Sequence, residues 1–128
     1  MYEKRFHSKV KTLEGLVMLS RLLTATTQRG DAEVLITLQS PIQGDGFWEC
    51  AFEIHWPEGT KSSRARGFDS VQATYLAMQN IAVHLYASHY HAEGKLRWGE
   101  PGTGYGFPMP KVGYEDLIGE DRIAQVPD

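Results

Sequence analysis

Histidines are the residues of this sequence with the clearest chemical potential. Three of the five lie close together, at His84, His89 and His91. Neutral imidazole binds Zn²⁺, Ni²⁺ or Cu²⁺ well, but a structural site needs four convergent groups, and ligands on one helix face are typically four residues apart. Here the second and third histidines follow the first by five and seven residues, and a polar helix end would carry histidine equally well. We therefore predict no metal and no cofactor, and keep these three as weak metal-site candidates.

A thiol and a base are also present, as Cys50 and His55. Strand alternation places them on opposite faces, so they cannot act together as nucleophile and base. Cys50 lies among apolar residues, where we expect a buried thiol with a raised pKa. It is the single cysteine, so an intrachain disulfide is excluded and a reducing, cytoplasmic location is expected. No catalytic residue is predicted, and we lean against an enzyme.

Glycines are concentrated in residues 99–110, which contain the spacing Gly-x-Gly-x-Gly. A dinucleotide-binding loop with this spacing would be followed by a helix, which Pro108 and Pro110 prevent. We predict instead a tightly turning loop whose Tyr105 and Phe107 either dock on the sheet or contact a partner. Long irregular loops often carry function, so these two aromatic residues are candidate partner-binding residues.

A second candidate surface is the polar face of a strand. Residues 47–56 alternate apolar and polar side chains, which is typical of a half-buried antiparallel strand. A four-residue turn at 57–60 would pair Trp56 with Lys61 and Glu53 with Arg64 on the next strand. The polar face then carries four candidate partner-binding residues: Glu49, Glu53, Arg64 and Arg66. Its two carboxylates are about 13 Å apart along the strand, too far to share a proton, so we favour binding over catalysis.

A helix is predicted after these strands, over residues 70–90. Asp69 and Gln72 have the spacing of a capping box, no Gly or Pro interrupts the segment, and Gly94 is a suitable stop. An apolar stripe recurs at helical period. Its members are Val71, Tyr75, Met78, Ala82 and Leu85.

Turn residues separate two strand-like runs within residues 21–42, which we predict to form a β-hairpin. We therefore predict an α+β fold: an antiparallel four-stranded sheet (meander) covered on one face by one long helix. A short C-terminal strand at 95–98 and the glycine-rich loop complete it.

The charge of −3 over 128 residues is distributed unevenly. Residues 1–18 form a basic leader that we expect to be partly ordered, 19–111 a single domain, and 112–128 an acidic C-terminal tail. The near balance of charge argues against a nucleic-acid partner. The apolar run at 16–19 is too short for a signal peptide and no run approaches a membrane span, so no membrane partner is predicted.

Three motifs of the chain resemble those of a family of small uncharacterised bacterial proteins, a domain of unknown function. They are the strand motif W-x-C-x-F-x-I from Trp48, the helix start G-F-D-S-x-Q-A from Gly67, and Trp98-Gly99 with Gly106-Phe107-Pro108. The likeness covers roughly residues 20–110. It implies a small soluble bacterial domain and points to no particular activity.

These observations favour a non-enzymatic protein-interaction module whose partner is another protein or a second copy of the chain. Immunity proteins, which bind and neutralise a toxin, are one class of this size, and the comparison is an analogy. The alternative is a small-molecule or metal-binding protein, or an enzyme, that uses the His84, His89 and His91 region beside the glycine-rich loop.

Overall fold

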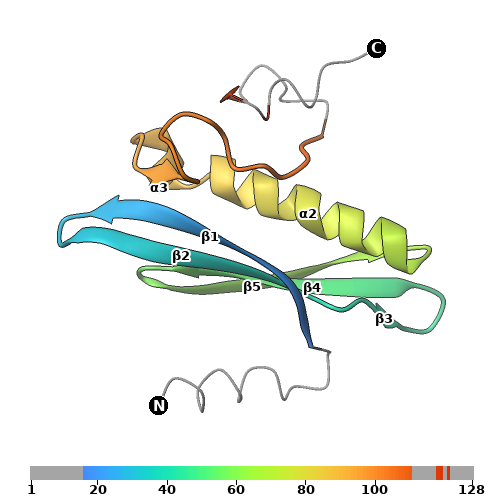
Figure 1. Cartoon of the computed structure of the whole chain (residues 1–128). Coiled ribbons are helices and arrows are strands. Elements are labelled where there is room, and N and C mark those ends of the chain that lie inside the picture. Colours follow the sequence, from blue (N-terminus) through green and yellow to red (C-terminus); the bar gives the residue numbers. More distant parts are fainter. Residues whose placement is uncertain (1–15, 111–117, 120, 122–128) are drawn as a thin grey trace.

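A single antiparallel sheet forms the base of the molecule (Figure 1). A computed structural model describes residues 16–110, 118, 119 and 121 of the chain. Six strands make up the sheet: β1 Val17–Thr27, β2 Gly30–Gln39, β3 Ile42–Gln43, β4 Trp48–Trp56, β5 Gly59–Gly67 and β6 Leu96–Arg97. The central path runs β3-β4-β2-β1-β6, and β5 pairs with β4. The predicted four-stranded meander is therefore confirmed, as is the short C-terminal strand, which is β6, and the short strand β3 is an addition.

Strand β4 is the strand that the sequence predicted from its alternation, and it is confirmed. Cys50, Phe52 and Ile54 are fully buried, while the residues between them are half-buried. Its pairing with β5 differs from the prediction. The turn contains two residues, Pro57 and Glu58, and Trp56 pairs with Gly59. Because the shift is an even number of residues, each β5 side chain keeps its predicted face but gains a different neighbour.

Helix α2, Ser70–Tyr86, covers one face of the sheet, and its N-terminus is built as predicted (Figure 1). The Asp69 carboxylate accepts a hydrogen bond from the backbone N–H of Gln72 at 2.8 Å. The Gln72 side chain accepts one from the N–H of Phe68 at 2.6 Å. This arrangement satisfies two donors that would otherwise lack partners at the helix start.

The predicted end of the helix is wrong. Helix α2 ends at Tyr86, and a separate short helix, α3, spans His89–Ala92. Ser88 causes the break, since its hydroxyl donates to the Leu85 carbonyl and accepts from the N–H of His91. A serine side chain that bonds to nearby backbone competes with helix continuation and favours a new N-cap.

The predicted stripe is buried in the second half of α2, at Ala82 and Leu85, but the first turns differ from it. Val71 and Tyr75 are 74% and 46% exposed, and the first buried positions are Ala73 and Ala77. A Cβ added to Gly67 would lie 2.5 Å from the Ala73 backbone nitrogen. The first turns of α2 therefore lie so close to β5 that only small residues fit between them, and the side chains of Val71 and Tyr75 point outward.

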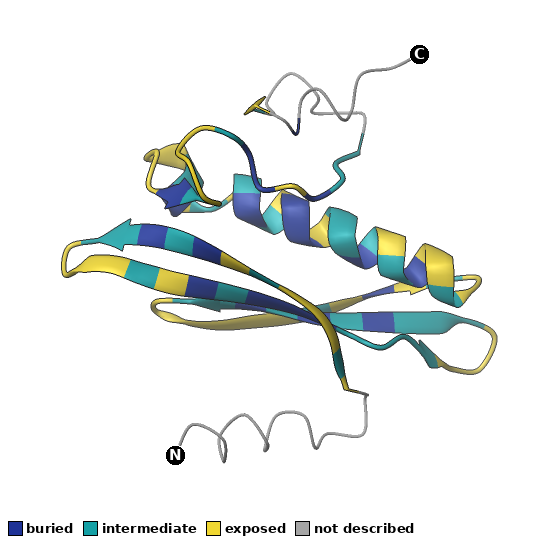
Figure 2. Cartoon of the chain, in the orientation of Figure 1, coloured by how far each residue is buried: buried dark blue, intermediate teal, exposed yellow. Residues whose placement is uncertain are grey.

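The core lies between the sheet and a covering layer that has two parts. Helix α2 covers β4 and β5, and the segment after β6 runs back along α2 (Figures 1 and 2). Tyr105 and Phe107 of that segment are 2% and 7% exposed and belong to the same core as Phe52 and Ile81. The glycine-rich loop thus completes the cover over the β1 side of the sheet.

Candidate functional site

The polar face of β4 and β5 carries a compact group of charges. Glu49 receives Arg66 Nε at 2.9 Å and Arg64 Nη1 at 3.3 Å, one on each carboxylate oxygen. Both arginines keep 58–63% of their side chains exposed. Glu53 faces Ser62 across the strands rather than Arg64 as predicted, and pairs instead with His55 on its own strand at 3.1 Å. The four predicted residues thus share a face, but form two groups.

An exposed apolar patch lies next to the Glu49 group. The Arg66 guanidinium lies over the Phe47 ring at 4.4 Å, and both residues line a small hollow together with Phe68. Phe68 is 89% exposed, the highest value among the large apolar residues of the described chain, and Val71 follows at 74%. We call these residues and Tyr75 the Phe68 surface: Phe47, Arg66, Phe68, Val71 and Tyr75.

Sequence reasoning did not identify Phe68, although a signal was present. Phe68 directly precedes the N-cap, the position where an apolar residue often packs against the fourth residue of the helix. That fourth residue is Ala73, which is fully buried and too small to receive the ring. A large aromatic residue at this position with alanine as its counterpart predicts a ring that stays in solvent.

The three predicted histidines face different surroundings. His84 lies against Phe52, with 5.9 Å between ring centroids, and burial together with the charge of Lys61 lowers its pKa. His89 lies 4.1 Å from the ring of Tyr90. His91 Nδ1 is 2.6 Å from the Tyr105 hydroxyl. Within the described residues, no three His, Cys, Asp or Glu side chains are grouped as metal ligands would be.

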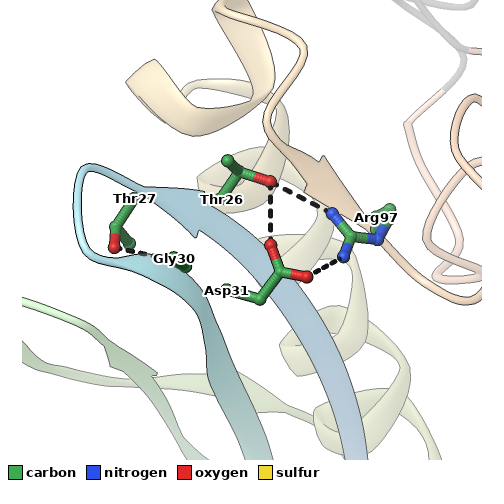
Figure 3. A network of polar contacts seen from close by, with 5 residues as sticks. All are labelled: Thr26, Thr27, Gly30, Asp31 and Arg97. Atoms are coloured by element: carbon green, nitrogen blue, oxygen red, sulfur yellow. Dashed lines mark hydrogen bonds and ion pairs between the residues drawn. The ribbon is translucent and has the colours of Figure 1, made fainter.

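A cavity of about 610 Å³ lies where the β1–β2 turn, the β4–β5 turn and α3 meet. Arg29, Glu58, His89 and Tyr90 are among its lining residues. One wall is fixed by Arg97 of β6, which donates to Asp31 Oδ2 at 2.6 Å and to the Thr26 hydroxyl at 3.1 Å (Figure 3). The volume suits a small molecule.

Tyr105 and Phe107 are docked in the core, which is the first of the two arrangements that the sequence left open, rather than presented to a partner.

Asp121 lies next to this loop and is only 4% exposed, although the sequence analysis placed it in an acidic tail. Its carboxylate accepts hydrogen bonds from the backbone N–H of Tyr105 and of Gly106, each at 2.7 Å, and from the Tyr86 hydroxyl at 2.9 Å. Apart from Ile118 and Gly119, the remaining tail residues lie outside the described part of the chain, as does the basic leader before position 16.

Residues 19–109 match the family described as a domain of unknown function, DUF6968. The chain belongs to this family. The match confirms the resemblance drawn from the three motifs. Neither the curated proteins nor the solved structures contain a significant match to the chain. No helix in the described residues is long and apolar enough to span a membrane.

The DUF6968 match contains all the predicted site residues and the whole Phe68 surface. It also contains the groups that donate to Asp121, whereas Asp121 itself follows the match by twelve residues. Among the described residues, the donors of that cluster therefore lie within the match, and the acceptor lies beyond it.

Proposed function

We propose that this DUF6968 domain is a protein-interaction module that binds a partner protein through the Phe68 surface. The carrying observation is the 89% exposure of Phe68 at the start of a well-capped helix. Isolated exposed apolar residues are common, but here Phe68 directly precedes the helix cap, and the exposed Val71 and Tyr75 follow on the first two turns of α2. Aromatic residues and arginine are the types most enriched among residues that dominate binding energy.

Rigidity supports the same proposal. The cap at Asp69 and the contact between Gly67 and Ala73 fix the first turn of α2 on β5. The backbone around Phe68 is therefore already held in place, and a partner that covers this residue immobilises little more than its side chain. Preorganisation of this kind lowers the entropic cost of association.

The neighbouring charges favour a partner that presents carboxylates. Arg64 and Arg66 share the single carboxylate of Glu49, which leaves this group with a local charge of +1. Each guanidinium has five N–H donors, and only one from each is directed to Glu49. The remaining donors suit bidentate contacts with Asp or Glu of a partner, at the rim of an apolar contact centred on Phe68.

Site-specific photocrosslinking tests this proposal in the organism that makes the protein. A photoreactive phenylalanine analogue at Val71 is expected to capture one protein, whereas the same analogue at Val83, 43% exposed further along α2, is not. The captured protein, once purified, should bind at least about tenfold more weakly to the Phe68→Ala variant.

Three results would count against the proposal. They are equal capture from Val71 and Val83, no capture from Val71, and an unchanged Kd for Phe68→Ala. Capture of a second copy of the same chain would replace the partner with a homodimer.

The cavity at α3 favours a second candidate function, the binding of a small molecule. Its walls combine the Arg29 and His89 side chains with Glu58, which accepts from the Tyr90 hydroxyl at 2.8 Å. A screen for ligands that raise Tm should then yield compounds whose effect is lost in Arg29→Ala and kept in Arg64→Ala. Ligands insensitive to Arg29→Ala would remove this candidate.

A further inference from the structure

The carboxylate of Asp121 lies in a nest of donors formed by the glycine-rich loop. Gly104 and Gly106 both have positive φ, at 92° and 79°, which turns the two successive N–H groups of Tyr105 and Gly106 to the same side. Successive backbone N–H groups oriented in this way form an anion-binding concavity. Each N–H reaches a different oxygen of Asp121, Oδ2 from Tyr105 and Oδ1 from Gly106.

Side chains complete the nest on two sides. The Tyr86 hydroxyl at the end of α2 donates to Oδ2 at 2.9 Å. Arg21 of β1 donates to the Tyr105 carbonyl at 3.0 Å, and its positive charge interacts with Asp121. The guanidinium is held between the Trp98 and Phe107 rings, at 3.9 and 4.7 Å from their centroids. A monoanion with two oxygens is therefore matched by three donors and one nearby cation.

The donors of the nest and their acceptor lie in different parts of the chain relative to the DUF6968 match. Arg21, Tyr86 and both N–H groups lie within the DUF6968 match, and the acceptor lies beyond it. Tyr105 is 2% exposed, so its N–H needs an acceptor other than bulk water. The matched residues thus form a carboxylate site whose occupant, Asp121, lies twelve residues beyond the match.

We propose that this nest is a carboxylate-binding site of the domain, and that Asp121 occupies it as an internal ligand. When Asp121 is absent, a carboxylate from elsewhere takes the same position on Tyr105, Gly106 and Tyr86. The chemistry is that of a small monocarboxylate or of an acidic side chain of another protein segment.

Replacement of the missing group by formate tests the site in the full chain. The Asp121→Ala variant removes the carboxylate and leaves space for formate, whereas Asp121→Asn fills the same space without the charge. Formate should raise the Tm of Asp121→Ala in a saturable manner, by about 4 °C or more over chloride at equal ionic strength. The wild type and Asp121→Asn should show no such rise.

The amide resonances of Tyr105 and Gly106 report binding at the site itself. Both should shift between wild type and Asp121→Ala, and formate should return them toward their wild-type positions. N-acetyl-aspartate amide distinguishes the two sources. If it stabilises Asp121→Ala at lower concentration than formate does, the ligand is an acidic side chain, and the reverse order indicates a small carboxylate.

Several outcomes would overturn the assignment. They are a Tm of Asp121→Ala that no carboxylate raises, equal stabilisation of Asp121→Asn, or amide resonances that formate does not move. If Asp121→Ala is unfolded in chloride, recovery of its circular dichroism in formate supports the site, and failure to recover in any carboxylate contradicts it. None of these results depends on the Phe68 surface, so the two proposals fail separately.

Discussion

His91 and Tyr105 form the closest side-chain contact between α3 and the glycine-rich loop, at 2.6 Å. Burial raises the pKa of Tyr105 to about 12 and lowers the pKa of His91. Near neutral pH the phenol therefore keeps its proton and the imidazole is neutral. The Tyr105 hydroxyl also lies 3.5 Å from the Leu96 carbonyl, so the tautomer of His91 sets whether this hydroxyl donates to Nδ1 or accepts from it. Protonation of His91 places a charge in a half-buried position.

Stability should therefore depend on His91 on the acid side of neutrality. A histidine with a lowered folded pKa binds fewer protons than in the unfolded chain, where its pKa is about 6.5. Its contribution is complete above that value and is lost as the pH falls through it. Urea unfolding at pH 7.5 and 5.5 should show a smaller loss for His91→Gln than for wild type. His84→Gln is the comparison variant, because the pKa of His84 is also lowered and contributes to the acid loss independently of His91. An identical loss of stability in wild type and His91→Gln would contradict the prediction.

The thiol of Cys50 should be inert in the folded protein. It is fully buried, its pKa is raised by burial, and it donates to the Gln39 carbonyl at 3.4 Å. Ellman's reagent is expected to detect no thiol in native protein and one in guanidinium chloride. Ser62→Cys, at an exposed position of β5, should add one thiol that reacts without denaturant. Rapid reaction of the native wild type would show that this part of the core opens.

At the scale of elements, sequence patterns located each main strand and the start of α2 because those features depend on local chemistry. The alternation of apolar and polar side chains located β4, and the spacing of Asp69 and Gln72 located the N-cap of α2. Two of the errors arise where the hydrophobic pattern carries no information. A two-residue and a four-residue β4–β5 turn place the same side chains on the same faces, and the break at Ser88 depends on hydroxyl bonds that no hydrophobic period reports.

The cap at Asp69 allows a stability prediction. Asp69→Ala removes the acceptor for the Gln72 N–H, and it should lower the free energy of unfolding by about 0.5–2 kcal/mol. Urea denaturation measures the change, with Asp45→Ala in the exposed loop before β4 as a control of equal charge. Equal losses for the two variants would mean that Asp69 acts only through its charge.

At the scale of the whole molecule, the Phe68 surface and the Asp121 nest lie beside opposite ends of α2. The helix has 17 residues, which corresponds to about 25 Å. Sequence analysis found the charged residues beside the first, and of the second it found the glycine-rich loop with Tyr105 but not the nest or Asp121. Asp121 binds mainly backbone N–H groups, whose positions follow from the fold rather than from residue types. The fold class was thus open to prediction, whereas a site built from backbone groups was not.

The two ends of α2 are far apart, so variants at the two ends should have additive effects on the free energy of unfolding. Asp69→Ala and Asp121→Asn share no contact, so their effects on the free energy of unfolding should add within about 0.5 kcal/mol. Tyr86→Phe and Asp121→Ala remove the same hydrogen bond and should couple by more than that. Double-mutant cycles measured by urea denaturation test both statements. Coupling between Asp69 and Asp121 would indicate that α2 transmits changes along its length.

The pairing of β1 has a consequence for the order of folding. Its pairing with β2 joins near neighbours in sequence, as do β4 with β5 and β5 with α2, so these units can form early. The contacts of β1 with β6 and of Arg21 with Tyr105 instead close loops of more than 70 residues. These closures cost the most chain entropy. We therefore expect β6 and the glycine-rich loop to pack onto β1 last during folding and to separate from it first during unfolding.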